Sequence, residues 1–303
     1  MSNRTVAVLG APTAAGAHWP GQEKAPAAFR AAGLADRLDR AGVAWVDRGD
    51  LPLAPWQVAR TEWAGGAVNN LDAVVAYAER VRDEVFSLLG DGAFPVVPGG
   101  DCTITVGAVA GAIRAGHAPG LIYVDGGWDL SSPAMYPAGI MDSMGLGHML
   151  DLPNVTRLAG IAGARPMLTP ERFVQFGHGT GASDGPEETL AREQAYLNLP
   201  NGVIAGRGAE AAREALAMLP ADLPAFWLHF DVDVIDFFDA PVADVPLHGN
   251  GLPYADAFAA VRVFANDRRC LGMTVTEFNP DHASAQPGLT ERFVSDLADV
   301  LRG

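Results

Sequence analysis

Leu228-His229-Phe230-Asp231-Val232-Asp233-Val234-Ile235-Asp236 joins an apolar run to three closely spaced carboxylates. Such a run is typical of a buried strand, and the acids mark the point where the strand ends. Asp231 and Asp233 can point to the same side, because side chains of an extended chain repeat every second residue. The segment therefore predicts a buried strand that delivers two carboxylates to one place.

Three other apolar runs lead into an acid in the same way. In an open parallel sheet the carboxyl ends of the strands share one edge, and ligands bind at that edge. We therefore expect these acids to converge with Asp231 and Asp233. The acids are Asp101 after 94–98, Asp125 at the end of 120–125, Asp129 four residues later, and Glu277 at the end of 270–277.

Short runs rich in β-branched and aromatic residues alternate with Ala-rich amphipathic stretches along the chain. This alternation is typical of βα units, and it predicts an α/β fold: a three-layer α/β/α sandwich with a central, mainly parallel β-sheet. No low-complexity linker or repeat interrupts it, so we expect a single domain over 1–303. The expected strands are 5–10, 43–47, 94–98, 120–125, 155–161, 173–177, 202–205, 225–231 and 270–277. The expected helices are 25–41, 68–90, 104–115, 143–151, 186–198, 208–219, 253–266 and 288–301.

The composition is that of a packed protein, with 49% hydrophobic and 19% charged residues among 303. The net charge of -15 argues against nucleic-acid and anionic-membrane partners, because Lys and Arg hold such surfaces, and it favours a cationic small-molecule substrate. We find no apolar run of the roughly 20 residues that cross a bilayer and no secretory signal, so we expect a cytoplasmic protein. Two cysteines, Cys102 and Cys270, give no disulfide framework.

The gathered carboxylates are expensive to keep ionised unless a cation neutralises them or protons are taken up. A single acid at a strand end has a simpler explanation as a helix cap or a solvated turn. A group of five or six on one edge is better explained as a functional cluster that binds metal.

Four blocks of sequence, each after an apolar strand, resemble the ureohydrolase superfamily, which contains arginase, agmatinase and formimidoylglutamase. Gly99-Gly100-Asp101-Cys102 resembles the family's Gly-Gly-Asp-His, and Asp125-Gly126-Gly127-Trp128-Asp129 resembles its Asp-Ala-His-x-Asp. Asp231 to Asp236 resembles Asp-x-Asp-x-x-Asp, and Glu277-Phe278-Asn279-Pro280 resembles Glu-x-Asn-Pro. The resemblance implies an arginase-like fold and a homo-oligomer, trimeric or hexameric.

In that family two manganese ions are bridged by two aspartates. The resemblance implies that Asp125 and Asp231 bridge, that Asp129 binds one ion and that Asp233 binds the other. Each ion also expects a histidine, and this chain has Cys102 and Gly127 at those two positions. One ion would thus exchange a nitrogen ligand for a thiolate, and the other would lose a ligand.

Cys102 changes the expected metal. Manganese prefers oxygen and nitrogen donors, whereas a thiolate selects softer ions such as zinc or iron, and nickel is a further candidate. We expect a divalent metal ion, and Cys102, Asp125, Asp129 and Asp231 can hold one ion more readily than the full set can hold two. Alternatively Cys102 is a small buried residue, or a nucleophile for which the sequence shows no paired base.

Three residues are predicted to be catalytic by the resemblance. Glu277 would hold a substrate guanidinium through two parallel hydrogen bonds, although it can also pair with Arg207. Asp129 would serve the attacking water. His148 lies near the place where the family has a proton-shuttling histidine, although a packing role is also open.

The sequence therefore predicts a hydrolase of a C–N bond in a guanidino- or amidino-type small molecule, with an atypical metal site that holds one ion or a metal other than manganese. The alternative is a non-hydrolytic family member, either a metal-free enzyme of specialised metabolism or an inactive binding or scaffold subunit. Loss of both histidines motivates this alternative, and the persistence of the aspartates opposes it.

Overall fold

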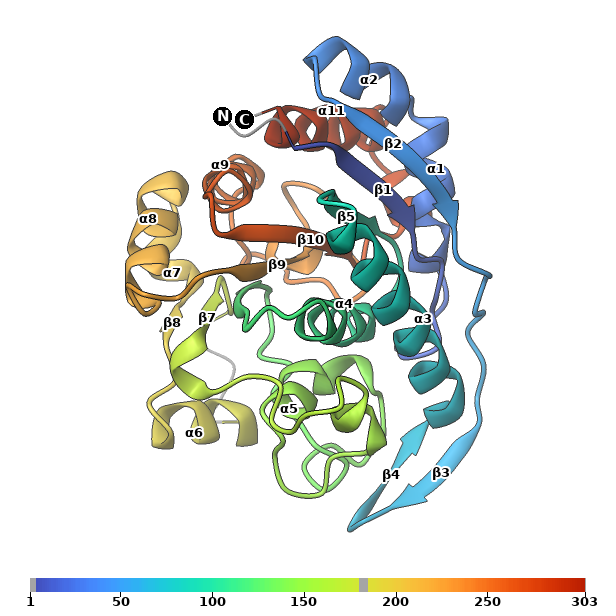
Figure 1. Cartoon of the computed structure of the whole chain (residues 1–303), viewed down its shortest axis with the longest axis vertical. Helices are drawn as coiled ribbons and strands as arrows, with labels where there is room; N and C mark the ends of the chain where they lie inside the picture. The colour runs from blue at the N-terminus through green and yellow to red at the C-terminus, as the bar shows by residue number, and fades with distance from the viewer. Residues whose placement is uncertain (1–3, 180–184, 303) are drawn as a thin grey trace.

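The computed structural model describes residues 4–179 and 185–302, and within them eight parallel strands form one sheet (Figure 1). A separate antiparallel hairpin consists of β3 (Arg60–Trp63) and β4 (Gly66–Asn69). The sheet order is β2 (Trp45–Asp50), β1 (Val6–Gly10), β5 (Phe94–Pro98), β10 (Cys270–Thr276), β9 (Phe226–Asp231), β6 (Gly120–Val124), β7 (Phe173–Phe176) and β8 (Asn198–Leu199).

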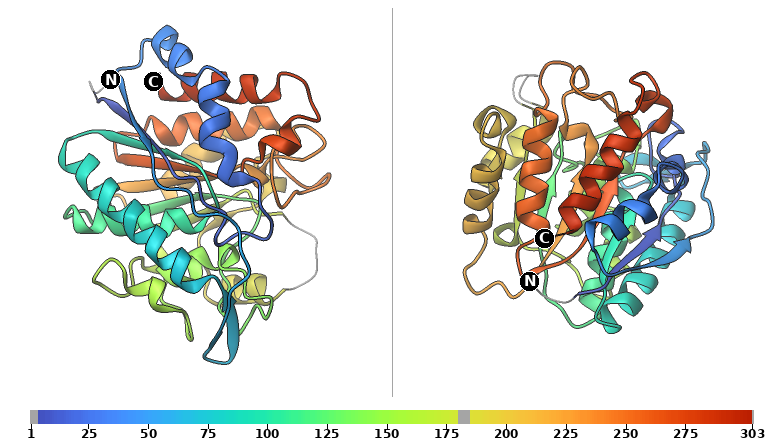
Figure 2. Two further views of the ribbon diagram at one scale, coloured as in Figure 1. Left: turned by 90° about the vertical axis from the view of Figure 1, so that its right-hand side faces the viewer. Right: turned by 90° about the horizontal axis from the view of Figure 1, so that it is seen from above.

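Helices cover both faces of this sheet (Figures 1 and 2). One face carries α1 (Ala25–Ala31), α2 (Leu34–Ala41), α8 (Gly208–Met218), α9 (Tyr254–Ala265) and α11 (Leu289–Leu301). The other carries α3 (Leu71–Gly90), α4 (Thr103–Arg114) and α5 (Gly145–Met149). Shorter helices are α6 (Pro186–Glu193), α7 (Asn201–Ile204) and α10 (Pro280–Ala283). The expected three-layer α/β/α sandwich is confirmed.

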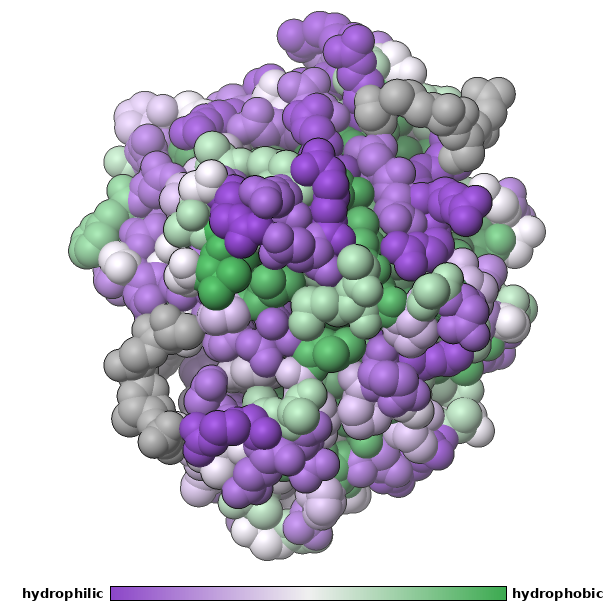
Figure 3. Space-filling model, turned by 90° about the vertical axis from the view of Figure 1, so that its left-hand side faces the viewer, coloured by the Kyte–Doolittle hydropathy of each residue, from purple (hydrophilic) through white to green (hydrophobic). Residues whose placement is uncertain are grey.

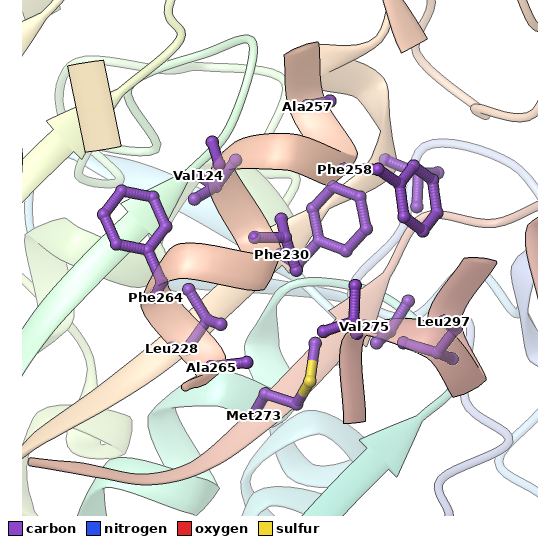
Figure 4. Close-up of a cluster of buried hydrophobic side chains, with 14 of the residues drawn as sticks. Val124, Leu228, Phe230, Ala257, Phe258, Phe264, Ala265, Met273, Val275 and Leu297 are labelled. Atoms are coloured by element: carbon purple, nitrogen blue, oxygen red, sulfur yellow. The ribbon is translucent and has the colours of Figure 1, made fainter. Parts of the chain in front are cut away.

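The core beneath α9 and α11 explains why the central strands are so apolar (Figure 4). Leu228 and Phe230 of β9 point to this side, whereas Trp227 lies in the core of the opposite face. Both faces of a parallel sheet are covered, so the strands are apolar at successive positions and do not simply alternate. A polar side chain within such a strand must therefore find its partners inside the protein.

Two expected strands are wrong. Residues 155–161 contain a 3-10 helix at Arg157–Gly160, where the Thr156 side chain accepts a hydrogen bond from the Leu158 backbone and caps the first turn. Residues 202–205 fall mostly in the short helix α7. A short apolar run fits a strand or a buried helical turn equally well, because four residues show no period.

Several expected helices are shorter than predicted. The helix at 25–41 is divided by Gly33, which takes a left-handed conformation with φ of 81°. The helix at 68–90 begins at Leu71, because the residues before it pair in the β3–β4 hairpin. The helix at 143–151 is reduced to α5, and 186–198 is α6 followed by β8. Tertiary pairing and turn chemistry thus override the helical pattern at the ends of these segments.

Hydrophilic residues cover most of the face shown in Figure 3, with apolar residues scattered between them. Within the described part of the chain, the helices are too short or too polar to cross a membrane. Both cysteines are buried and free.

Candidate active site at the carboxyl edge of the sheet

The four central strands β5, β10, β9 and β6 are neighbours in the sheet, and each leads into one of the acids singled out from the sequence. Because the strands are parallel, their carboxyl ends meet at one edge. Cys102, Asp125, His229 and Asp231 are brought together there, with one ligand atom from each lying within 4.8 Å of the others. The edge therefore holds a compact set of sulfur, nitrogen and oxygen donors.

Cys102 stands at the first turn of α4 and is 2% exposed. Its thiol donates to Asp231 Oδ2 at 2.7 Å and lies 3.3 Å from Thr276 Oγ1. The sulfur is 3.7 Å from His229 Nε2. Burial, and then the carboxylate of Asp231, raise the pKa of the Cys102 thiol well above its usual range. The cysteine is therefore a protonated donor as long as no cation is present.

His229 belongs to β9, and its ring is fully buried. Its Nδ1 lies 2.7 Å from Thr105 Oγ1, and its Nε2 lies 3.3 Å from Asp125 Oδ2. The ring stacks on Tyr123 at a centroid distance of 3.9 Å. Burial lowers the pKa of His229 to about 3, so the imidazole is neutral. A neutral ring fixed through one nitrogen is the form in which histidine binds metals.

His229 is a candidate metal ligand that was not predicted from the sequence. It precedes Asp231 by two positions in the same strand, so the two side chains lie on the same face. The two-residue spacing from Asp231 could have identified His229 in the sequence, because the same spacing predicted that Asp231 and Asp233 point to one side.

Asp129 and Asp233 lie on the side of the cluster that is partly open to solvent, together with Gly127. The Tyr123 hydroxyl donates to Asp129 Oδ2 at 2.6 Å, and the Gly126 N–H donates to Asp233 Oδ1 at 2.8 Å. A Cβ placed on Gly127 would lie 3.4 Å from Asp125 Oδ1 and 4.0 Å from Asp129 Oδ1, so a Cβ fits there at ordinary contact distance. The open side of the cluster therefore has carboxylates with free coordinating capacity.

The carboxyl groups repel one another. Burial, followed by neighbouring aspartates, raises the pKa of Asp125 and of Asp231 well above the usual range. Burial raises the pKa of Asp233 to about 6. A cation bound among these groups would reverse the shifts, because it stabilises their ionised forms. The donor atoms, together with the repulsion among the buried carboxylates, therefore fit a metal ion.

A second group adjoins the first, with atoms of Cys102, Asp142 and Glu277 within 4.8 Å of one another. Asp142 Oδ1 accepts the backbone N–H of Cys102 at 2.5 Å. Burial, and then Asp101, raise the pKa of Asp142 to about 8. Burial, and then Asp142, raise the pKa of Glu277 well above its usual range. Two carboxyls whose ionisation burial disfavours therefore lie beside Cys102.

Asp142 was missed in the sequence, because no strand precedes it. It closes the long loop at 126–142, and the backbone N–H of Asp142 donates to the carbonyl of Gly16. An acid at the end of a long glycine- and proline-containing loop between a strand and a helix is the sequence signal it offers.

The structure corrects the placement of His148. Its Nδ1 lies 2.7 Å from the Met144 carbonyl and its Nε2 lies 2.8 Å from Thr156 Oγ1, so both ring nitrogens are occupied. The ring is fully buried, and burial lowers its pKa to about 4. His148 therefore holds the turn that follows α5 and does not join the acids.

Other residues named from the sequence have structural roles. Asp101 accepts hydrogen bonds from Gly16 N and Thr103 N, which ties the N-terminal loop to α4. Asp236 accepts from Phe238 N and Gly251 N and holds a turn. Arg207 forms its ion pairs with Glu210 and Glu214. The alternative pairing of Arg207 with Glu277 is therefore not the one that the structure has. Trp128 donates its indole N–H to Glu188 and packs against His178.

An α/β sandwich with a buried donor cluster at the carboxyl edge of its sheet defines the class of this protein. Residues 4–301 match the Arginase family, and the chain belongs to that family. It is 28% identical to arginase of Brevibacillus brevis over 279 residues, which cover 92% of this chain and 91% of that protein. It is also 28% identical to arginase of Bacillus subtilis (strain 168) over 304 residues, which cover 99% and 98%.

Solved structures give the same result. The structure of arginase from Bacillus caldovelox superposes with a TM-score of 0.84 at 25% identity and covers 98% of both chains. Arginase from Entamoeba histolytica has the same TM-score at 18% identity, which supports the fold alone. The family expected from the four sequence blocks is thus confirmed.

Proposed function

We propose that this chain hydrolyses a C–N bond in a guanidino- or amidino-type small molecule, using one divalent ion held by Cys102, Asp125, His229 and Asp231. The observation that carries the proposal is that these four buried side chains place ligand atoms within 4.8 Å of one another. Relatives named arginase share the fold and most of the chain length, which supports the substrate class. The acidic surroundings favour a cationic substrate.

The donors support a softer ion than manganese. The related formiminoglutamase of Trypanosoma cruzi was solved with Mn²⁺. In the present chain a thiolate and an imidazole join two carboxylates, and this mixture suits zinc or iron. Gly127 has no side-chain donor for a second ion, which supports one ion over two. We propose zinc as the first candidate.

The remaining residues suit hydrolysis. The ion, when bound, would supply Lewis-acid activation of a water molecule. Asp129, oriented by the Tyr123 hydroxyl, can accept a proton from that water. Glu277 can hold the cationic end of the substrate. Asp142 has a carboxyl oxygen within 4.8 Å of one of Glu277, and in its protonated form it can give a proton to the leaving amine once the C–N bond breaks.

Thiol nucleophilicity is disfavoured. His229 lies 3.7 Å from the Cys102 sulfur, which is the arrangement of a cysteine and its base. However, burial and the adjacent carboxylates raise the thiol pKa, whereas nucleophilic cysteines need a lowered pKa. Cys102 is therefore better suited to bind a cation than to attack a substrate.

The test is metal-dependent turnover. Purified protein is incubated with arginine, agmatine and formiminoglutamate, and the release of urea, amine or formamide is measured before and after treatment with a chelator. We expect activity on at least one guanidino or amidino compound, its loss with the metal, and its loss in Asp129→Asn. The exposed Asp222→Asn serves as the matched control and should retain activity. Turnover that survives complete metal removal would refute the proposal.

A further inference from the structure

Gln22 is a fully buried glutamine beside the proposed substrate carboxylate. It begins the 3-10 helix Gln22–Lys24, which follows the loop after β1. Its Nε2 lies 3.5 Å from Glu277 Oε1. The preceding Gly21 has φ of 149°, and a Cβ there would lie 2.1 Å from Asn279 Nδ2. The loop is therefore pressed against the Glu277–Asn279 segment, and Gln22 is fixed beside Glu277.

The amide oxygen of Gln22 has no hydrogen-bond partner among the described residues. Glu277 Oε2 is likewise buried and has no hydrogen-bond partner among the described residues. A buried acceptor without a donor is costly, and most such groups in proteins are satisfied. Two adjacent side chains therefore present acceptors that a ligand with several N–H groups would satisfy.

We propose that Gln22 is a specificity-determining residue of this chain, whose amide oxygen accepts an N–H of a guanidinium or amidinium held on its other edge by Glu277. This inference rests on the proposed function. A planar cation can donate two parallel N–H groups to the carboxylate, and the N–H groups on its far edge then need another acceptor. An ammonium group carries its three N–H bonds on one atom and can use them on the clustered carboxyl oxygens of Glu277 and Asp142.

The test compares two cations with the same alkyl chain, butylguanidinium and butylammonium. Their dissociation constants are measured by calorimetry on wild type, Gln22→Met and the exposed Gln286→Met, at matched metal content. We expect Gln22→Met to weaken butylguanidinium by about tenfold or more, the effect of one hydrogen bond to a charged group, while butylammonium changes less than about threefold. Gln286→Met should behave as wild type.

Equal losses for both cations, or no loss for either, would overturn the inference. If Gln22→Met does not fold, a crystal structure of the wild-type protein with butylguanidinium is the second measurement. A nitrogen of the cation within hydrogen-bond distance of Gln22 Oε1 supports the inference, and a cation seated elsewhere overturns it. The proposed function is contradicted by a different result, namely turnover without metal or no turnover at all. The role of Gln22 is contradicted if Gln22→Met still prefers butylguanidinium to the same extent as the wild type.

Discussion

His229 and His148 are both fully buried histidines whose pKa burial lowers, yet their surroundings differ completely. His148 has both ring nitrogens bound within its own loop region, by Met144 and Thr156. His229 has one nitrogen fixed by Thr105, while the other points at Asp125 and Cys102. What a histidine can do therefore follows from the nitrogen its neighbours leave available, and not from its distance in sequence to a motif.

The largest effect is expected from removing each ring in turn. His229→Ala should lower metal affinity by more than about 100-fold, since changes to residues that merely orient a ligand already cost about 10- to 100-fold. His148→Ala should leave metal affinity unchanged and lower the free energy of unfolding by about 2–4 kcal/mol, because it removes buried hydrogen bonds and creates a void. Competition with a chromophoric chelator and denaturant unfolding measure the two quantities. Equal metal affinity in both variants would show that His229 is not a metal ligand.

The sequence located the edge of the sheet that carries the site. The runs that became β5, β6, β9 and β10 are apolar and lead into acids, so both their burial and their convergence follow from local pattern and parallel topology. The runs at 155–161 and 202–205 are apolar without being strands, because each packs as a short helical turn. Periodicity cannot separate these cases over so few residues.

Within the site, the sequence pattern of apolar runs identified the residues that directly follow strands. It missed the residues that loops distant in sequence bring into the site. Cys102, Asp125 and Asp231 come directly after apolar runs and are adjacent in the structure. Asp142 reaches Cys102 from the end of a loop, and Gln22 reaches Glu277 from the N-terminal loop. Such contacts depend on how loops fold over the strand ends, which no local sequence period encodes.

A smaller effect, on the number of bound metal ions, is expected when a histidine is added on the side of the cluster that is partly open to solvent. Gly127→His should raise bound metal from one towards two ions per chain, because a Cβ at this position makes only ordinary contacts with Asp125 and Asp129 and the imidazole adds a nitrogen donor. Gly127→Ala, which fills the space without a donor, should remain at one. Elemental analysis after dialysis against excess manganese or zinc gives the ratio. A ratio that stays at one in Gly127→His would mean that Asp125, Asp129 and Asp233 cannot complete a second site.

The smallest effect is on stability as a function of pH. Burial raises the pKa of Asp233 to about 6, that of Asp142 to about 8, and those of Asp125, Asp231 and Glu277 well above the usual range. These five carboxyls outnumber His229 and His148, whose lowered pKa values act in the opposite direction. Between pH 4 and 8 the folded metal-free protein therefore binds more protons than the unfolded chain. Its stability is therefore greatest on the acid side of this window and falls as pH rises through it. We expect the melting temperature of chelator-treated protein to drop by several degrees from pH 5 to pH 8. Saturating metal should abolish the drop, because metal binding requires deprotonated ligands. A melting temperature of the metal-free protein that rises over this range would contradict the electrostatic account.

The central claim is that one ion is bound with Cys102 as a ligand, and cobalt substitution tests it most directly. The metal-free protein is titrated with Co²⁺ while near-ultraviolet absorption is followed, with Cys102→Ser and Cys270→Ser in parallel. The account predicts a thiolate-to-cobalt charge-transfer band that saturates at one equivalent in wild type and in Cys270→Ser, and that is missing in Cys102→Ser. Cobalt binding without that band in the wild-type protein, or saturation of the band at two equivalents, would contradict it.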